Sequence, residues 1–224
     1  LELCTGRRAG AVRGVEAPER QVLTLAAADA ILRELGGGRS DAVLTLAGAG
    51  DPMLHPDIFR IVGLARRAGI VGVHVRTDLL CEPERVDRLL EVDVVSVNLG
   101  AETAATYRAV MGSESFDRAR GNLQRPLERR AARAAPGGLP TPWIVPRITR
   151  CDATYSEIGS FYDRWIMLAG AAVIDPLSAP SPGERIEPLP IPDAAARRMA
   201  QERMLVLSDG KVPASEGDIA GERI

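Results

Sequence analysis

A glycine-rich turn after an apolar run is the first place in this sequence where residue types and spacing suggest chemistry. Residues 42–47 read as a buried strand, and the turn that follows contains Gly48, Gly50, Asp51 and Pro52. Glycine lets a backbone approach a bound molecule closely, and α/β folds bind ligands beyond the carboxyl ends of their strands. The turn is therefore a candidate ligand-binding loop, although Gly-Asp-Pro also suits an ordinary strand-to-helix connection.

Polar side chains alternate with aliphatic ones in three further runs, residues 71–76, 93–99 and 143–148. Because successive side chains of a strand point to opposite faces, we expect the aliphatic face to pack against helices and the other face to line an interior. That second face carries His74, Arg76, Ser96, Asn98 and Arg147. A purely structural barrel core favours branched aliphatic residues, so this face predicts a wet cavity that holds a polar ligand. The alternative is that these side chains pair with one another and fill a small barrel.

The cysteines are few and widely spaced. Cys4, Cys81 and Cys151 lie too far apart in the sequence to predict a disulfide framework or a zinc ribbon. Unpaired cysteines are typical of a reducing compartment, so we expect a cytoplasmic protein.

Other catalytic and metal-binding signatures are absent or weak. The sequence contains no nucleophile elbow, Walker loop, HExxH or CxxC motif. Asp51, His74 and Asp78 could form a carboxylate and histidine metal site at the mouth of a barrel, but they are loosely spaced. We therefore predict no metal ligands among them.

Strand-like and helix-like segments alternate regularly along the chain. The expected strands are 1–4, 42–47, 71–76, 93–99, 143–148 and 172–175, and the expected helices are 25–35, 57–68, 83–90, 102–110, 116–134 and 155–168. Such alternation predicts an α/β fold with a parallel sheet and helical crossovers. Six units suit a partial (β/α)6 barrel, and an open doubly wound sheet is the competing architecture. Thr24 is the expected N-cap of the first helix, and Pro126 is expected to kink or split the fifth.

The last fifty residues differ in character from the rest. Residues 176–192 are rich in proline and have no periodicity, which predicts an extended linker. Residues 193–203 read as a short helix, and the stretch around Asp209 and Gly210 reads as a hairpin. We therefore expect a domain over residues 1–175, the linker, and a small segment over 193–224.

The totals exclude some classes of partner. A net charge of −2 and a pI near 5.8 give no long-range attraction to nucleic acid or to an anionic membrane. No apolar stretch reaches the ~20 residues that span a bilayer. The chain begins inside a strand-like segment and ends without a stop signal, so we expect it to be part of a longer protein.

Taken in order, several of these segments resemble the core of the radical S-adenosylmethionine (radical SAM) family. The turn at Gly48 to Pro52 is similar to the family's Gly-Gly-Glu-Pro turn, which holds the methionine end of S-adenosylmethionine. Later motifs of the family are similar to Thr77-Asp78, to the strand with Ser96 and Asn98, and to Tyr107 followed by Gly112. The resemblance covers about residues 20–175. It implies a partial barrel and an S-adenosylmethionine site formed by Gly48, Gly50, Asp51, Pro52, Ser96, Asn98 and Arg147, with Arg147 as partner of the ligand carboxylate.

The family's cluster motif is missing. Radical SAM enzymes bind a [4Fe-4S] cluster through Cys-x-x-x-Cys-x-x-Cys, and three thiolates leave one iron open for the ligand. Counting from Cys4, the other two positions are Arg8 and Ala11, neither of which can replace a thiolate. The tail resembles the start of a SPASM extension, which binds auxiliary clusters, but Ser215 stands at one of its cysteine positions. The resemblance therefore implies a degenerate relative.

Three functions stay open at this point. The first is a radical SAM/SPASM-like enzyme by descent that modifies a peptide or small molecule, with cluster ligands supplied by missing sequence. The second is a pseudoenzyme that binds S-adenosylmethionine, a peptide or a partner protein through the cavity. The third is an unrelated α/β-barrel enzyme that uses Asp51, His74 and Arg147.

Overall fold

The computed structural model describes residues 2–4, 22–37, 42–47, 51–133, 140–176, 187, 189–190 and 204–212. These residues fall into two compact units. The first holds the described residues up to Arg76 together with 204–212, and the second holds those from Thr77 to residue 190. Most of the predicted linker and all of the helix predicted at 193–203 lie outside the described residues, so the domain boundaries stay a prediction.

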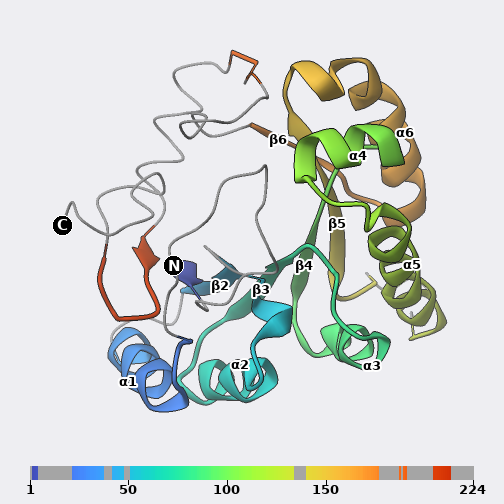
Figure 1. Cartoon of the computed structure of the whole chain (residues 1–224). Coiled ribbons are helices and arrows are strands. Elements are labelled where there is room, and N and C mark those ends of the chain that lie inside the picture. The colour runs from blue at the N-terminus through green and yellow to red at the C-terminus, as the bar shows by residue number, and fades with distance from the viewer. Residues whose placement is uncertain are drawn as a thin grey trace. The chain divides into compact units, whose positions relative to one another are not determined.

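The first unit is built from parallel strands and two helices. Its elements are β1 (Glu2–Cys4), α1 (Leu25–Gly36), β2 (Val43–Ala47), the 3-10 helix η1 (Pro52–Leu54), α2 (Ile58–Arg67), β3 (Gly72–Thr77) and β7 (Leu205–Val206). Parallel pairing joins β2 to β1 and to β3, and β7 pairs in parallel with β1. In Figure 1, α1 and α2 lie side by side along these strands. A turn follows β7 where the hairpin was predicted, since Leu207 N–H donates to the carbonyl of Lys211 at 2.8 Å. Within the described residues 204–212, however, β7 pairs with β1 and not with a returning strand.

Contacts at both ends fix how α1 and α2 lie against each other. At the start of α1, Thr24 is the predicted N-cap, and its hydroxyl accepts from Ala27 N–H at 3.1 Å. The imidazole of His55 joins the starts of both helices, because Nε2 donates to the Leu23 carbonyl at 2.7 Å and Nδ1 accepts from Asp57 N–H at 3.0 Å. At the other end, a Cβ on Gly36 would lie only 1.9 Å from the carbonyl oxygen of Ala68, so the two backbones are in contact there.

The second unit repeats the β/α pattern. Its elements are α3 (Pro83–Asp87), the 3-10 helix η2 (Arg88–Glu91), β4 (Val94–Gly100), α4 (Ala104–Met111), α5 (Phe116–Arg133), β5 (Trp143–Arg150), the 3-10 helix η3 (Asp152–Glu157), α6 (Ile158–Ala169) and β6 (Val173–Pro176). Parallel pairing joins β5 to β4 and to β6. The expected α/β class with parallel strands is therefore confirmed, and α4, α5 and α6 lie along one side of β4 and β5 (Figure 1).

Two expectations about helices need correction. The segment expected to form one helix at 83–90 instead forms the α-helix α3, which is followed directly by the 3-10 helix η2 from Arg88. Pro126 does not split α5, which runs from Phe116 to Arg133 with the proline ring buried.

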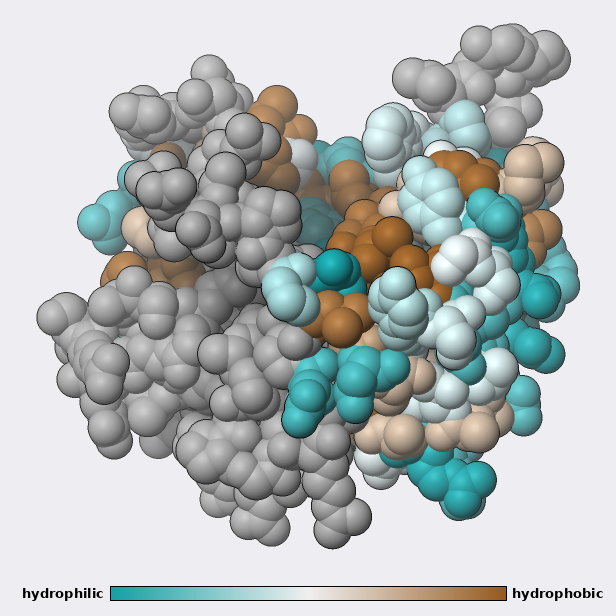
Figure 2. All heavy atoms as spheres, turned by 90° about the horizontal axis from the view of Figure 1, so that it is seen from above, coloured by the Kyte–Doolittle hydropathy of each residue, from teal (hydrophilic) through white to brown (hydrophobic). Residues whose placement is uncertain are grey.

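Burial follows the predicted alternation in β3 but not throughout β4 and β5, where Ser96 and Arg147 of the polar face are also buried. Val73, Val95 and Ile148, which belong to the aliphatic faces, are fully buried, whereas His74 and Asn98 are half-buried. On the face seen in Figure 2, hydrophobic residues (brown) form a patch near the middle of the view, and hydrophilic residues (teal) are frequent along its right edge. Among the described residues, no helix is both long and apolar enough to cross a lipid bilayer.

The turn that joins β4 to α4 depends on a glycine. Gly100 ends β4 with φ of 71°, in the left-handed region that side chains rarely adopt. A Cβ at this position would also lie 2.8 Å from the Sδ of Met111. Both observations mean that only glycine fits here without a shift of its surroundings.

The start of α4 is capped from outside the helix by Glu157. One carboxylate oxygen accepts from the hydroxyls of Thr103 and Thr106, each at 2.7 Å, and the other accepts from Glu102 N–H at 2.8 Å. Burial raises the pKa of Glu157, but these hydrogen bonds outweigh burial and hold the pKa below its ordinary value. An ionised carboxylate thus satisfies donors at the positive end of the helix.

Candidate functional site

A cluster of polar residues lies near the carboxyl ends of the strands of the second unit. Asp78 directly follows β3, Asn98 lies near the end of β4, Arg147 lies in β5, and Asp175 lies in β6. In the parallel ladder, Asn98 is opposite Arg147, and Arg147 is opposite Val173, two residues before Asp175. Paired residues and residues two apart share a face of a sheet, so β4, β5 and β6 present these side chains on one side.

Arg147 and Asp175 form a two-pronged ion pair. The Nε of Arg147 donates to Oδ2 of Asp175 at 3.2 Å, and the second nitrogen lies 2.5 Å from Oδ1. The arginine side chain is only 10% exposed and the aspartate 26%. A bidentate geometry of this kind fixes the plane of the guanidinium group, so Arg147 has a neutralising carboxylate beside it before any ligand binds.

Asn98 and Asp78 form a second pair in the same cluster. The amide Nδ2 of Asn98 donates to Oδ1 of Asp78 at 3.0 Å. Burial and the nearby Asp78 carboxylate raise the pKa of Tyr107 to about 12, so this phenol stays protonated at neutral pH. Ser96 lies two residues before Asn98 on the same strand face and is buried. The structure therefore brings together three of the predicted residues, Ser96, Asn98 and Arg147.

The remaining predicted residues belong to the first unit or lie outside the description. Asp51 is buried, and its Oδ1 accepts from Met53 N–H at 2.9 Å, which makes it the N-cap of η1 directly before Pro52. His74 places Nδ1 3.2 Å from the hydroxyl of Thr45, its neighbour in the ladder. Gly48 and Gly50 lie outside the described residues.

The described residues do not fit a metal or a [4Fe-4S] cluster. Nowhere in the part of the chain that the structure describes do three or more His, Cys, Asp or Glu side chains gather in a group that could hold an ion. Cys81 and Cys151 are both buried. Cys151 packs in an apolar cluster with Tyr107 and Phe116 among others, and its Sγ lies 3.5 Å from the Thr154 hydroxyl. Thiols in such surroundings behave as small apolar residues rather than cluster ligands.

The fold is shared with solved structures of two proteins that bind S-adenosylmethionine. A crystal structure of Streptococcus suis SuiB bound to S-adenosylmethionine matches 96% of this chain with a TM-score of 0.69 and 12% sequence identity. The structure of anSMEcpe with bound S-adenosylmethionine matches 96% of the chain with a TM-score of 0.64 and 10% identity. This chain has a radical SAM-type fold. The expected partial-barrel fold is thereby confirmed, while the low identities carry the comparison no further than the fold.

The comparisons also limit what can be concluded about the whole protein. The chain spans 60% of the length of SuiB and 74% of the length of anSMEcpe. SuiB has also been solved with its precursor peptide SuiA, and that structure matches the whole of this chain with a TM-score of 0.64. Searches against family models and against curated proteins gave no match.

Two participants in the cluster were not among the predicted site residues. Asp175 lies at the end of a run that reads as a short apolar strand, and Asp78 was considered only as a metal ligand. The signal that could have identified both is their position, since each lies at or just after the carboxyl end of a predicted strand.

Proposed function

We propose that this chain is a degenerate radical SAM-type protein that binds S-adenosylmethionine, or a similar adenosyl ligand, without cleaving it. The observation that carries the proposal is the polar cluster of the second unit, in which Arg147 is paired with Asp175 and Asn98 with Asp78. The cluster lies near the carboxyl ends of parallel strands, where α/β folds bind ligands.

The chemistry of the cluster suits a zwitterionic ligand. S-adenosylmethionine carries a carboxylate, an ammonium group and ribose hydroxyls. Arg147 would take the carboxylate, and the carboxylates of Asp78 and Asp175 would accept from the ammonium group or the hydroxyls. Ser96 and Asn98 would add a hydroxyl and an amide. The turn from Gly48 to Pro52 stays part of this proposal through the family resemblance.

Catalysis by a radical mechanism is not part of the proposal, because the residues present do not fit the cluster that would supply it. The neighbours with bound peptides, SuiB with SuiA and anSMEcpe with Cp18Cys, support a peptide or protein as partner or substrate of the complete protein. The SPASM-like character of the tail, through residue Ser215, and a cytoplasmic location stay predictions.

Calorimetry with S-adenosylmethionine tests the proposal. A full charge-assisted hydrogen bond is worth about 1.5–3 kcal/mol, but a ligand carboxylate has to share Arg147 with Asp175 or displace it. We therefore expect Arg147→Gln to weaken binding by up to about tenfold. Asn98→Ala should weaken it less. Arg150→Gln is the matched control, because Arg150 lies three residues further along β5, on the opposite face, where it donates to the Leu189 carbonyl.

The outcomes separate the alternatives. Equal affinities for the wild type and Arg147→Gln would remove Arg147 from the site, and no heat from the wild type would favour a purely partner-binding protein. Anaerobic incubation with iron and sulfide should leave the visible spectrum without a cluster band. A stoichiometric cluster that is lost on Cys4→Ser would instead restore the enzyme interpretation.

A further inference from the structure

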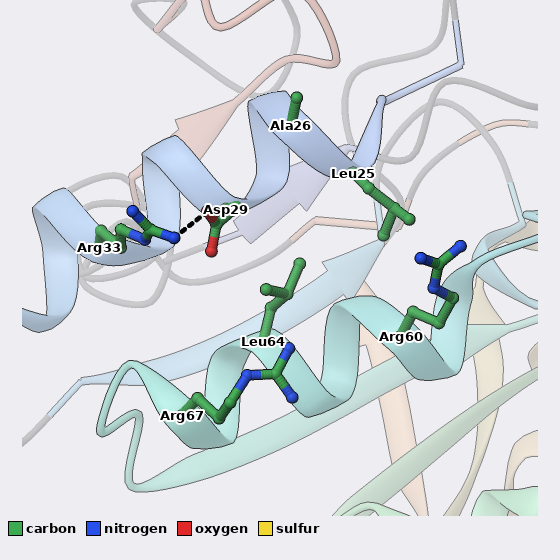
Figure 3. A pocket seen from close by; sticks show the side chains of 7 residues that line it. All are labelled: Leu25, Ala26, Asp29, Arg33, Arg60, Leu64 and Arg67. Atoms are coloured by element: carbon green, nitrogen blue, oxygen red, sulfur yellow. Dashed lines mark ion pairs between the residues drawn. The ribbon is translucent and has the colours of Figure 1, made fainter.

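A groove on the first unit has a composition that the proposed function does not use. It lies between α1 and α2 and has a volume of about 370 Å³. The residues that line it are Leu25, Ala26, Asp29, Arg33, Arg60, Leu64 and Arg67. On α1, residues 26, 29 and 33 follow helical spacing, and on α2 residues 60, 64 and 67 do the same, so each helix contributes one face. Figure 3 shows Leu64 pointing from α2 toward α1, between Arg60 and Arg67 along its own helix.

The groove carries an excess of positive charge. Arg33 pairs with Asp29 at 2.6 Å, and Arg60 pairs with Asp57 at 3.0 Å. The two arginines are 77% and 72% exposed, and ion pairs as exposed as these contribute little to stability. Within the described ranges, no ion pair of Arg67 is found. The guanidinium of Arg67 is thus not neutralised by an ion pair. Arg33 and Arg60 can each exchange a weakly held aspartate for a ligand carboxylate.

The spacing of the charges argues against a single small anion. Arg60 and Arg67 are seven residues apart on α2, which is about 10 Å along a helix axis. Figure 3 shows the guanidinium groups of Arg60 and Arg67 apart from each other, so one phosphate or acetate does not contact both in this arrangement. Between them the floor is aliphatic, formed by Leu25, Ala26 and Leu64. A fitting occupant therefore presents carboxylates about 10 Å apart with an apolar side chain between them.

We propose that the α1/α2 groove is a docking site for an acidic segment of a polypeptide, with glutamate or aspartate carboxylates on Arg33, Arg60 and Arg67 and an apolar side chain over Leu64. A polypeptide fits better than nucleic acid, because the floor is aliphatic and the chain as a whole has a net charge of −2. The proposal does not depend on what the polar cluster of the second unit binds.

Fluorescence anisotropy with defined peptides tests this docking site. The probe is a labelled peptide of about 12 residues, long enough to span two helical turns in either conformation, that contains glutamates and leucines. Its partner has glutamine in place of every glutamate. The glutamate peptide should bind the wild-type chain at low salt and lose affinity as the salt concentration rises, and the glutamine peptide should not bind.

Three variants make the test specific. Arg67→Gln removes the unneutralised charge, and Ala26→Glu places a carboxylate in the groove at an exposed position near the start of α1, where an acidic residue suits the helix. Each should weaken binding by on the order of threefold to tenfold. Arg133→Gln is the control, since Arg133 is an exposed arginine on α5 of the second unit. Circular dichroism checks that all three variants stay folded.

Several results would overturn the proposal. One is a wild-type chain that does not bind the glutamate peptide, and another is a loss of affinity in Arg133→Gln equal to that in Arg67→Gln. Displacement of the peptide by inorganic phosphate at matched ionic strength would identify a simple anion site instead. Equal binding of a single-stranded oligonucleotide of the same charge would identify a nonspecific cationic surface.

Discussion

Arg147 and Asp175 are joined through two contacts across neighbouring strands, at 3.2 Å and 2.5 Å. Because Arg147 is almost fully buried, the aspartate is its compensating charge inside the second unit. A ligand carboxylate that binds Arg147 must therefore share the guanidinium with Asp175 or displace it. The free energy that Arg147 contributes to ligand binding is therefore the difference between its ion pair with the ligand and its ion pair with Asp175.

Loss of the Asp175 carboxylate should destabilise the fold. Asp175→Asn removes the carboxylate that pairs with the buried Arg147 guanidinium, and we expect the free energy of unfolding to fall by about 2 kcal/mol, less than for a fully buried pair because Asp175 is partly exposed. Urea denaturation measures this. Glu91→Gln is the control, since the Arg88–Glu91 pair is about half exposed on both sides and should contribute under about 1 kcal/mol. Equal losses in the two variants would show that burial does not set the value of the Arg147 pair.

Two glycine substitutions should have opposite effects. Gly100→Ala introduces a Cβ at positive φ and against Met111, and we expect a loss of about 1–3 kcal/mol in the free energy of unfolding. Gly121→Ala lies inside α5, where a Cβ meets nothing within 4 Å, and should stabilise by up to about 1 kcal/mol through helix propensity. Thermal unfolding of the two variants beside the wild type decides the matter. A neutral Gly100→Ala variant would mean that the turn after β4 can change its conformation at little cost.

The cap on α4 should make stability depend on pH in the acid range. The pKa of Glu157 is lower in the folded chain than its ordinary value, so the unfolded chain binds the proton more readily as the pH falls. The stabilisation is fully present above about pH 4.3 and is lost as the pH falls through the lower folded pKa. Glu157→Gln should be less stable than wild type at neutral pH, and the difference should shrink in acid. A constant difference over that range would show that the charge of Glu157 does not matter to the cap.

Local features of the fold could be predicted because they depend on neighbouring residues. The cap at Thr24, the turn at Asp209 and Gly210, and the alternating burial of β3 all follow from local hydrogen bonding and from the period of two in a strand. The tighter turn at Arg88 and the passage of α5 through Pro126 could not be predicted in the same way, since packing around each segment outweighs local propensity.

The pairs of the polar cluster lay beyond sequence reasoning for a different reason. Arg147 and Asp175 are 28 residues apart, and Asn98 and Asp78 are 20 apart. Which residues meet depends on the register between strands, and a shift by one residue would turn every side chain to the other face. The sequence indicated that the polar residues share a face of the sheet. Their partners could not be predicted without knowing the register between the strands. Asn98 pairs with Asp78 and Arg147 with Asp175, and neither aspartate belongs to the predicted polar set, so these two pairs do not match the alternative that the set pairs with itself.

The contacts at the two ends of α1 and α2 have a consequence for selectivity. His55 bridges the beginnings of the helices, and Gly36 meets Ala68 at their ends. The distance between the two helices is thus fixed before anything binds, by the imidazole of His55 at one end and by the absence of a Cβ on Gly36 at the other. A preorganised surface loses little entropy on association and rejects occupants of the wrong thickness. Any change in what the groove accepts should therefore come from the side chains along its rim, while the helices keep their spacing.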